Sequence, residues 1–138
     1  MFVARDVMRT EVITVTPETL VEEVIEIFGR HQISGLPVVD HQNRPQGVIT
    51  EHDVLRAIRA NQLDQPVADH MSASLVAIDE STSLEDVTEL FITKQIRRVP
   101  VTRDDQIVGM ISRRDLIQMG NIRHQILDHL PVMTEAGV

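Results

Sequence analysis

The sequence predicts an α/β (α+β) fold made of two similar β-α-β-β-α units. The first observation is an internal repeat, in which residues 16–39 match residues 79–102 at a constant offset. The second is that each copy alternates short β-branched runs, typical of strands, with segments whose apolar residues recur at helical spacing. The third is a motif that closes each copy, Gly47–Asp53 in the first and Gly109–Asp115 in the second. Such repeats normally need each other to bury their sheets, so we expect two pseudo-symmetric units packed sheet to sheet.

The first unit is expected to contain three strands and two helices. The strands are Val12–Val15, Leu36–Val39 and Gln46–Ile49. Thr16 is expected to cap the first helix, with Pro17 as its first residue. The second helix covers Glu51–Ala60. We place the first motif at residues 1–64.

The second unit, at residues 65–130, repeats this order. Its expected strands are Leu75–Ile78, Val99–Thr102 and Gln106–Ile111. Thr82 and Glu85 form a capping-box pattern at the start of a helix that runs to Lys94. A further helix covers Arg113–Met119, breaks or kinks at Gly120 and continues over Ile122–Leu130. Residues 131–138 are expected to be a C-terminal tail.

The composition narrows the function classes. The chain has 138 residues, a net charge of −8 and no cysteine, which removes disulfides, thiol catalysis and cysteine-type zinc sites. His124 and His129 are poorly spaced for metal binding, so no metal site is expected. The negative charge argues against nucleic acid as a partner, and no apolar run is long enough to span a membrane. We therefore expect a soluble, cytoplasmic protein.

Positive charge is nevertheless concentrated in the second half. Five arginines gather there within a short span: Arg97, Arg98, Arg103, Arg113 and Arg114. A local basic site on an acidic protein favours a small anionic ligand over a polyanion. A pairing of Arg97 and Arg98 with Asp104 and Asp105 is the alternative.

The closing motifs carry the chemistry of such a site. Each places a hydroxyl, of Thr50 or Ser112, three residues before a carboxylate, of Asp53 or Asp115. The predicted helix start adds free backbone N–H groups, and together these groups can hold a ribose and a phosphate. The alternative is that each pair only caps its helix. Neither hydroxyl has an evident catalytic base, so we do not interpret them as nucleophiles and expect a protein that is not an enzyme.

The repeat resembles the CBS domain, the small module named after cystathionine β-synthase. The resemblance rests on Ile33–Asp40 as the middle strand and on the two closing motifs at matched spacing, and it covers about Asp6 to Gln118. It implies a stand-alone Bateman module, in which two clefts between the units bind AMP, ADP, ATP or S-adenosylmethionine. It also implies a disc-like homodimer and regulation of an unidentified effector protein.

In this family each cleft combines the closing motif of one unit with the opening strand and middle-strand segment of the other. By position, one cleft is implied to contain Val48, Thr50, Asp53, Leu75, Val76, Ile96, Arg97, Arg98 and Pro100. The other is implied to contain Val12, Ile13, Ile33, Ser34, Gly35, Pro37, Met110, Ser112, Arg114 and Asp115. Arg97 and Arg98 stand where the first unit has Ser34 and Gly35, so we expect the Asp53 cleft to bind phosphate more strongly.

Two functions follow from these expectations. The leading one is a regulatory, energy-sensing module that binds an adenosine-containing nucleotide and signals to a partner by a conformational change. The alternative is a dimerisation or scaffolding module with degenerate clefts, whose pairing surface consists of the helices after each motif.

Overall fold

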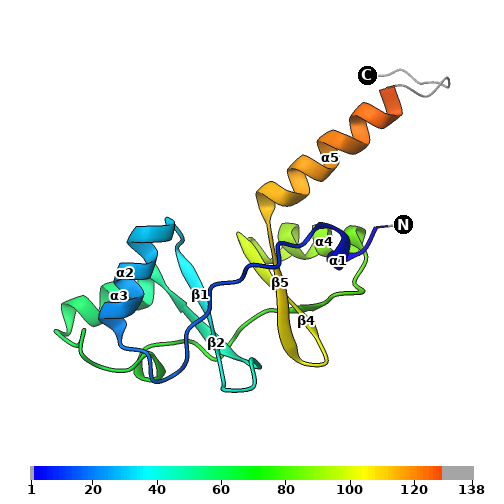
Figure 1. Cartoon of the computed structure of the whole chain (residues 1–138). Coiled ribbons are helices and arrows are strands. Elements are labelled where there is room, and N and C mark those ends of the chain that lie inside the picture. The colour runs from blue at the N-terminus through cyan, green and yellow to red at the C-terminus, as the bar shows by residue number, and fades with distance from the viewer. Residues whose placement is uncertain (1, 129–138) are drawn as a thin grey trace.

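The computed structural model describes residues 2–128, which form two lobes of mixed helices and strands (Figure 1). The first lobe contains α2 (Val21–His31), β1 (Gly35–Val39), β2 (Pro45–Thr50) and α3 (Glu51–Arg59). The second contains β3 (Ile78–Asp79), α4 (Leu84–Lys94), β4 (Arg98–Arg103), β5 (Gln106–Ser112) and α5 (Arg113–Asp128). A short helix α1 (Ala4–Val7) and a 3₁₀ turn η1 (Val67–Asp69) complete the elements. The predicted fold class is confirmed.

Each lobe is built on an antiparallel hairpin. β1 pairs with β2, and β4 pairs with β5, while β3 adds a short parallel strand beside β4. In both hairpins the register shifts near the turn, after Val38 and after Val101, which are equivalent positions of the repeat. The predicted hairpins are therefore confirmed, together with their shared geometry.

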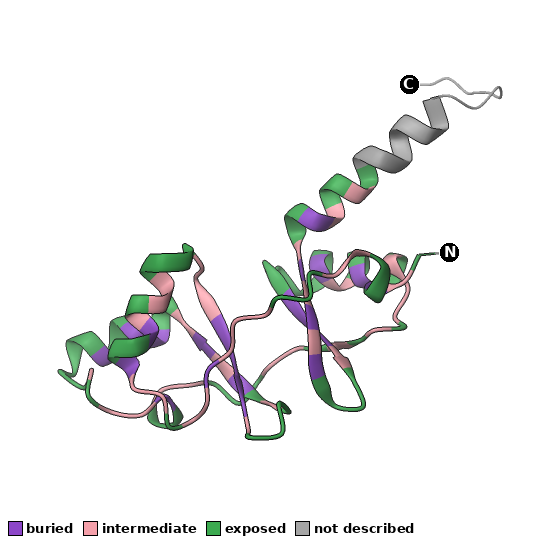
Figure 2. Cartoon of the chain, viewed as in Figure 1, coloured by how far each residue is buried: buried purple, intermediate pink, exposed green. Residues whose placement is uncertain are grey.

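Each hydrophobic core contains a buried residue from a short segment outside the repeat that forms the rest of that core. Ala4 is fully buried in the second lobe's core, against Val87 and Val99, although it comes from the start of the chain. Val67, which follows the first motif, is fully buried in the first lobe's core. Figure 2 shows the buried residues concentrated in the strands and the inner faces of the helices. Each core is thus completed by chain from outside its own repeat.

Backbone hydrogen bonds fix these crossings. The N–H of Ala4 donates to the carbonyl of Thr82 at 2.8 Å, and Arg9 and Met110 exchange two bonds of 2.9 Å. In the first lobe Val48 and Ser72 exchange the equivalent pair, at 2.8 and 2.9 Å. Two equivalent segments therefore lie against the closing strands β2 and β5.

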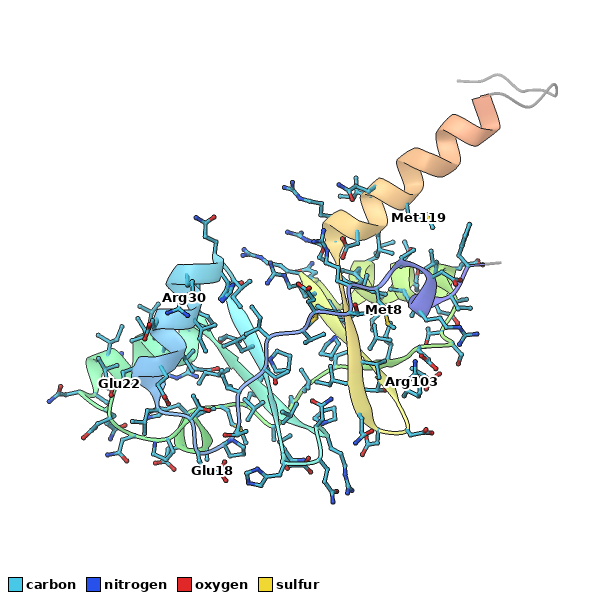
Figure 3. The ribbon with its side chains drawn as sticks, viewed as in Figure 1. Met8, Glu18, Glu22, Arg30, Arg103 and Met119 are labelled. Atoms are coloured by element: carbon cyan, nitrogen blue, oxygen red, sulfur yellow. The ribbon has the colours of Figure 1, made fainter. Side chains whose placement is uncertain are left out.

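The motif glycines permit these close approaches. A Cβ added at Gly47 would lie 2.3 Å from the carbonyl oxygen of Ser72. One added at Gly109 would lie 2.4 Å from the sulfur of Met8, which Figure 3 shows beside β5. A side chain at Gly47 would push the crossing segment off β2, whereas one at Gly109 would first displace the flexible side chain of Met8.

An ion cluster also ties the N-terminal segment to the second lobe. The guanidinium of Arg103 donates two hydrogen bonds of 2.9 Å to the two carboxylate oxygens of Glu80, and Arg5 lies 4.0 Å away. These bonds, chiefly the side-chain hydrogen bond from Arg103, hold the pKa of Glu80 below its ordinary value of 4.5. The cluster holds α1 on the loop that precedes α4.

The predicted opening strands are wrong over most of their length. Of residues 12–15 only Val15 pairs, through one parallel bridge to Val38, and in the second lobe only Ile78 and Asp79 form a strand. Pro37 explains the difference, because its carbonyl accepts from the N–H of Val15 on the side where its own nitrogen has no proton to donate. Pro100 holds the same place in the repeat, so the ladder stops there in both lobes.

Two predicted helix starts are also wrong. α2 begins at Val21, not Pro17, because residues 16–19 form a separate turn and Glu23 accepts from the N–H of Leu20 at 2.8 Å. α4 is capped by Ser83 rather than Thr82, through a hydrogen bond from the N–H of Asp86 to the Ser83 hydroxyl at 3.1 Å. Thr82 is engaged in holding Ala4.

The predicted break at Gly120 is wrong as well, because α5 is continuous from Arg113 to Asp128. α5 differs from its counterpart in packing: α3 lies on β2 and α2, whereas α5 contacts β5 and α1 and extends away from the lobes (Figure 1). Leu130 and the predicted tail lie outside the described residues. Within residues 2–128 no helix is long and apolar enough to cross a membrane.

Candidate functional site

One large open cleft lies between the lobes, with a volume of about 1530 Å³. Both lobes line it, and the two sets of residues predicted as separate clefts form its two halves. We call them the Asp53 half and the Asp115 half. All of the predicted site residues line the cleft except Asp53. A single small-molecule site typically occupies about 300–1,000 Å³, so this cleft has room for more than one ligand.

In the Asp115 half, the closing motif forms a compact polar corner. The N–H of Ser112 donates to Oδ2 of Asp115 at 2.9 Å, and the N–H of Asp115 donates back to the Ser112 hydroxyl at 3.2 Å. Oδ1 of Asp115 accepts from Nε of Arg9 at 3.1 Å. Asp115 is 9% exposed and lines the cleft, so its carboxylate is both fixed and reachable.

The Asp53 half has the same motif with a different partner. The N–H and hydroxyl of Thr50 donate to Oδ2 of Asp53 at 2.8 and 3.0 Å. Oδ1 accepts from Arg56, one turn further along α3. Arg56 lines a separate groove with His52, Leu55 and Arg59. Asp53 was expected in the cleft but is not among its lining residues, and its carboxylate is bound by Thr50 and Arg56.

These contacts also correct the expectation of free helix N–H groups. The N–H of Glu51 donates to the carbonyl of Ser34, and the N–H of Arg113 donates to the carbonyl of Arg97, both at 3.0 Å. The first donor of each helix is therefore used to hold the segment before the middle strand. This bond places Ser34 and Arg97 beside the hydroxyls of the motifs.

Four arginines bring positive charge to the cleft. Arg97, Arg98, Arg113 and Arg114 line it and are solvent-exposed. Among the side chains that the structure describes, those of residues 2–120, none of them has a carboxylate oxygen within 4.0 Å of its guanidinium. The alternative pairing of Arg97 and Arg98 with the turn acids is thus not formed, and the fifth arginine, Arg103, is held by Glu80 instead. Four like charges in one cleft attract an anion.

The opening segments supply polar backbone groups to the same cleft. Because Pro37 and Pro100 end the parallel ladders, residues 12–13 and 75–76 lie in the cleft without a strand partner. Apolar side chains flank them: Ile33, Ile96, Val48 and Met110. A flat heterocyclic base fits such a place, since it needs apolar contact on its faces and hydrogen bonds at its edge.

Some cleft residues were missed by the sequence reasoning. Arg9, Glu11, Phe28 and Gln32 also line the cleft. Arg9 carries no motif, and its position follows from the crossing of the N-terminal segment onto β5. The repeat could have pointed to it, because Arg9 corresponds to Ser72 one residue after the matched methionines Met8 and Met71.

Comparison with known proteins agrees with this geometry. The family model described as CBS domain matches the chain twice, at residues 4–60 and 67–121, so the chain belongs to the CBS-domain family and is a tandem pair. The CBS domain-containing protein YhcV of Bacillus subtilis is 34% identical over 121 residues, which cover 85% of this chain and 86% of YhcV.

One relative is a much longer enzyme, and one similar solved structure contains a bound nucleotide. The inosine-5'-monophosphate dehydrogenase of Aquifex aeolicus is 29% identical over 91% of this chain, but the match spans only 30% of that enzyme. The crystal structure of CBSX2 in complex with AMP superposes with a TM-score of 0.79 at 25% identity, and covers 90% of this chain and 99% of CBSX2. CBSX2 is a protein of Arabidopsis thaliana.

The cleft therefore combines exposed cations, the fixed carboxylate of Asp115 and apolar walls. Among the described side chains, which end at residue 120, no group of three histidine or acidic residues is arranged to hold a metal ion. The hydroxyls of Thr50 and Ser112 both accept hydrogen bonds from their helix backbones. The arrangement is suited to binding an anionic ligand that also carries hydroxyl groups and a flat apolar surface.

Proposed function

We propose that this protein is a regulatory module that binds an adenosine-containing nucleotide in the cleft between its two CBS motifs. The observation that carries the proposal is the set of four cleft arginines that have no carboxylate partner within the described residues. A phosphate would accept charge-assisted hydrogen bonds from these guanidinium groups. The AMP complex of CBSX2, a relative at 25% identity, supports adenosine as the nucleoside.

The parts of a nucleotide match the parts of the cleft. Asp115 would accept from the ribose hydroxyls, the arginines would hold the phosphate, and Ile33 and Met110 would enclose the base. The two halves are related by the repeat, so we propose a capacity of two nucleotides. We propose that the Asp53 half is the stronger phosphate site, because it contains Arg97 and Arg98. For Asp53 to contact a ligand there, its carboxylate must leave Arg56.

Regulation would act through the relative arrangement of the lobes. Each half draws residues from both lobes, so a ligand that prefers one arrangement shifts the population toward it. We propose that α5 transmits the change, because it starts directly after Ser112 and extends from the second lobe. The receiving protein is proposed to be a separate effector, or a second copy of this chain.

Thermal unfolding with a nucleotide panel tests the proposal. A ligand at a hundred times its Kd should stabilise the protein by about 2.7 kcal/mol. The panel includes adenosine, AMP, ADP, ATP, S-adenosylmethionine and GTP, and we expect a shift with the phosphorylated adenosine compounds. The double variant Arg97→Ala/Arg98→Ala should lose most of the shift with AMP. Arg30→Ala is the matched control, because Arg30 is an exposed arginine paired with Glu26 outside the cleft.

A scaffolding role is the second candidate, favoured by the apolar surface of α3. Leu55 and Ile58 are 60% and 49% exposed on this helix. If no adenosine compound shifts the melt while light scattering reports a dimer that Leu55→Asp dissociates, scaffolding replaces ligand binding as the function. A shift that survives the Arg97/Arg98 change unaltered would place the ligand elsewhere.

A further inference from the structure

The two carboxylates of the repeat have arginine partners that come from different places. Asp115 is paired with Arg9, from the N-terminal segment, and Asp53 is paired with Arg56, from its own helix. Neither arginine is repeated in the other unit. Ser72 stands in the position of Arg9, and Gln118 in that of Arg56. Only Arg9 lies in the cleft, because Arg56 lines the separate groove on α3.

The geometry of Arg9 suits it to a second task. Its backbone is fixed against β5 by the two hydrogen bonds with Met110, while its side chain is 66% exposed. Its Nε donates to Asp115, and its two terminal nitrogens make no hydrogen bond to the described side chains or backbone of residues 2–120. A guanidinium held by Nε keeps its terminal N–H groups available for a phosphate.

We propose that Arg9 sets the charge preference of the Asp115 half, by pairing with Asp115 until a ligand phosphate draws it away. The inference rests on the proposed function and adds a selecting residue to it. A ribose must compete with Arg9 for Oδ1 of Asp115. An uncharged nucleoside gains nothing in return, whereas a nucleotide offers Arg9 a new anionic partner. Arg9 therefore opposes adenosine and favours AMP.

This mechanism predicts effects of opposite sign in one variant. Arg9→Ala removes the competitor of the ribose, so the affinity for adenosine should stay equal or rise. The same change removes a phosphate contact, so the affinity for AMP should fall by about tenfold or more, as expected for loss of a charge-assisted hydrogen bond. A residue that only supports the fold would lower both affinities together. Because the side chain is exposed and the contacts with β5 are made by the backbone, Arg9→Ala should fold.

The experiment is calorimetric titration of adenosine and AMP in an Asp53→Asn background, which reduces binding at the other half. The variants are Arg9→Ala, Arg9→Lys and, as the control, Arg56→Ala. We expect the AMP-to-adenosine preference to fall at least tenfold in Arg9→Ala, to fall less in Arg9→Lys, which keeps the charge, and to be unchanged in Arg56→Ala.

The outcomes separate the two proposals. If AMP binds but Arg9→Ala leaves the preference unchanged, or lowers both affinities equally, the role of Arg9 is overturned and the proposed function stands. If neither compound binds even the unaltered protein, both proposals are overturned. A circular dichroism melt of each variant checks that the fold is retained, and Arg9→Lys supplies the comparison if Arg9→Ala fails to fold.

Discussion

Replacing Gly47 with alanine should destabilise the protein strongly, although it adds a single methyl group. The new Cβ would lie 2.3 Å from the carbonyl oxygen of Ser72, which belongs to the backbone and cannot rotate away. To relieve the overlap, the crossing segment must leave β2 and weaken its two hydrogen bonds with Val48. Overpacking costs about 1–3 kcal/mol and each lost hydrogen bond about 1 kcal/mol. We expect a loss of about 3 kcal/mol or more in the free energy of unfolding.

Thermal and urea unfolding measure this loss. At about 3–5 °C per kcal/mol for a chain of this size, the Tm should fall by about 10 °C. Gly120→Ala is the control, since a Cβ there meets nothing within 4 Å and alanine is the better helix former. It should leave the stability equal or slightly higher. A Tm for Gly47→Ala within about 2 °C of the unaltered protein would refute the close crossing of residue 72 over β2.

Three further predictions concern the second lobe. Gly109→Ala should cost less than Gly47→Ala in urea unfolding, because its nearest obstacle is the flexible side chain of Met8; an equal cost would mean that Met8 cannot move. Ser112→Ala and Ser83→Ala each remove a hydroxyl that caps a helix and should each cost about 1 kcal/mol, but only Ser112→Ala should weaken AMP in calorimetry; equal AMP affinities would leave Ser112 a cap alone. Glu80→Gln should lower the free energy of unfolding at pH 7 but not in acid. A carboxyl whose pKa is lowered on folding stabilises the protein above its ordinary pKa of 4.5, and this contribution is lost as the pH falls through the lowered pKa. A constant difference in the free energy of unfolding between the two proteins from pH 7 to 3 would contradict this prediction.

The sequence predicted the repeat, the hairpins and the helices because these depend on local periodicity. It failed where contacts between distant segments decide the structure. Val12–Val15 has the composition of a strand, but its pairing is limited by Pro37 across the sheet. Thr82 is a good cap by type, yet Ser83 takes the role because the Thr82 carbonyl receives Ala4.

The site shows the same division. Matching the repeat was enough to predict all of the cleft residues proposed from it except Asp53, since both halves follow one pattern. The partner of each carboxylate was not predictable, because it depends on which arginine lies within hydrogen-bond distance in the folded chain. Arg56 was three residues from Asp53 and was overlooked, while Arg9 is distant in sequence from Asp115 and becomes its partner only through the crossing.

The central claim is that a nucleotide binds in the cleft through its arginines. Native mass spectrometry of the protein, titrated with AMP, counts the bound nucleotides directly. We expect up to two AMP molecules on each chain, with loss of the species that carries two AMP molecules in Arg97→Ala/Arg98→Ala, which alters the Asp53 half, but not in Arg30→Ala. A protein that retains no AMP at any concentration up to the millimolar range, or that retains it equally in the double variant, would contradict the account.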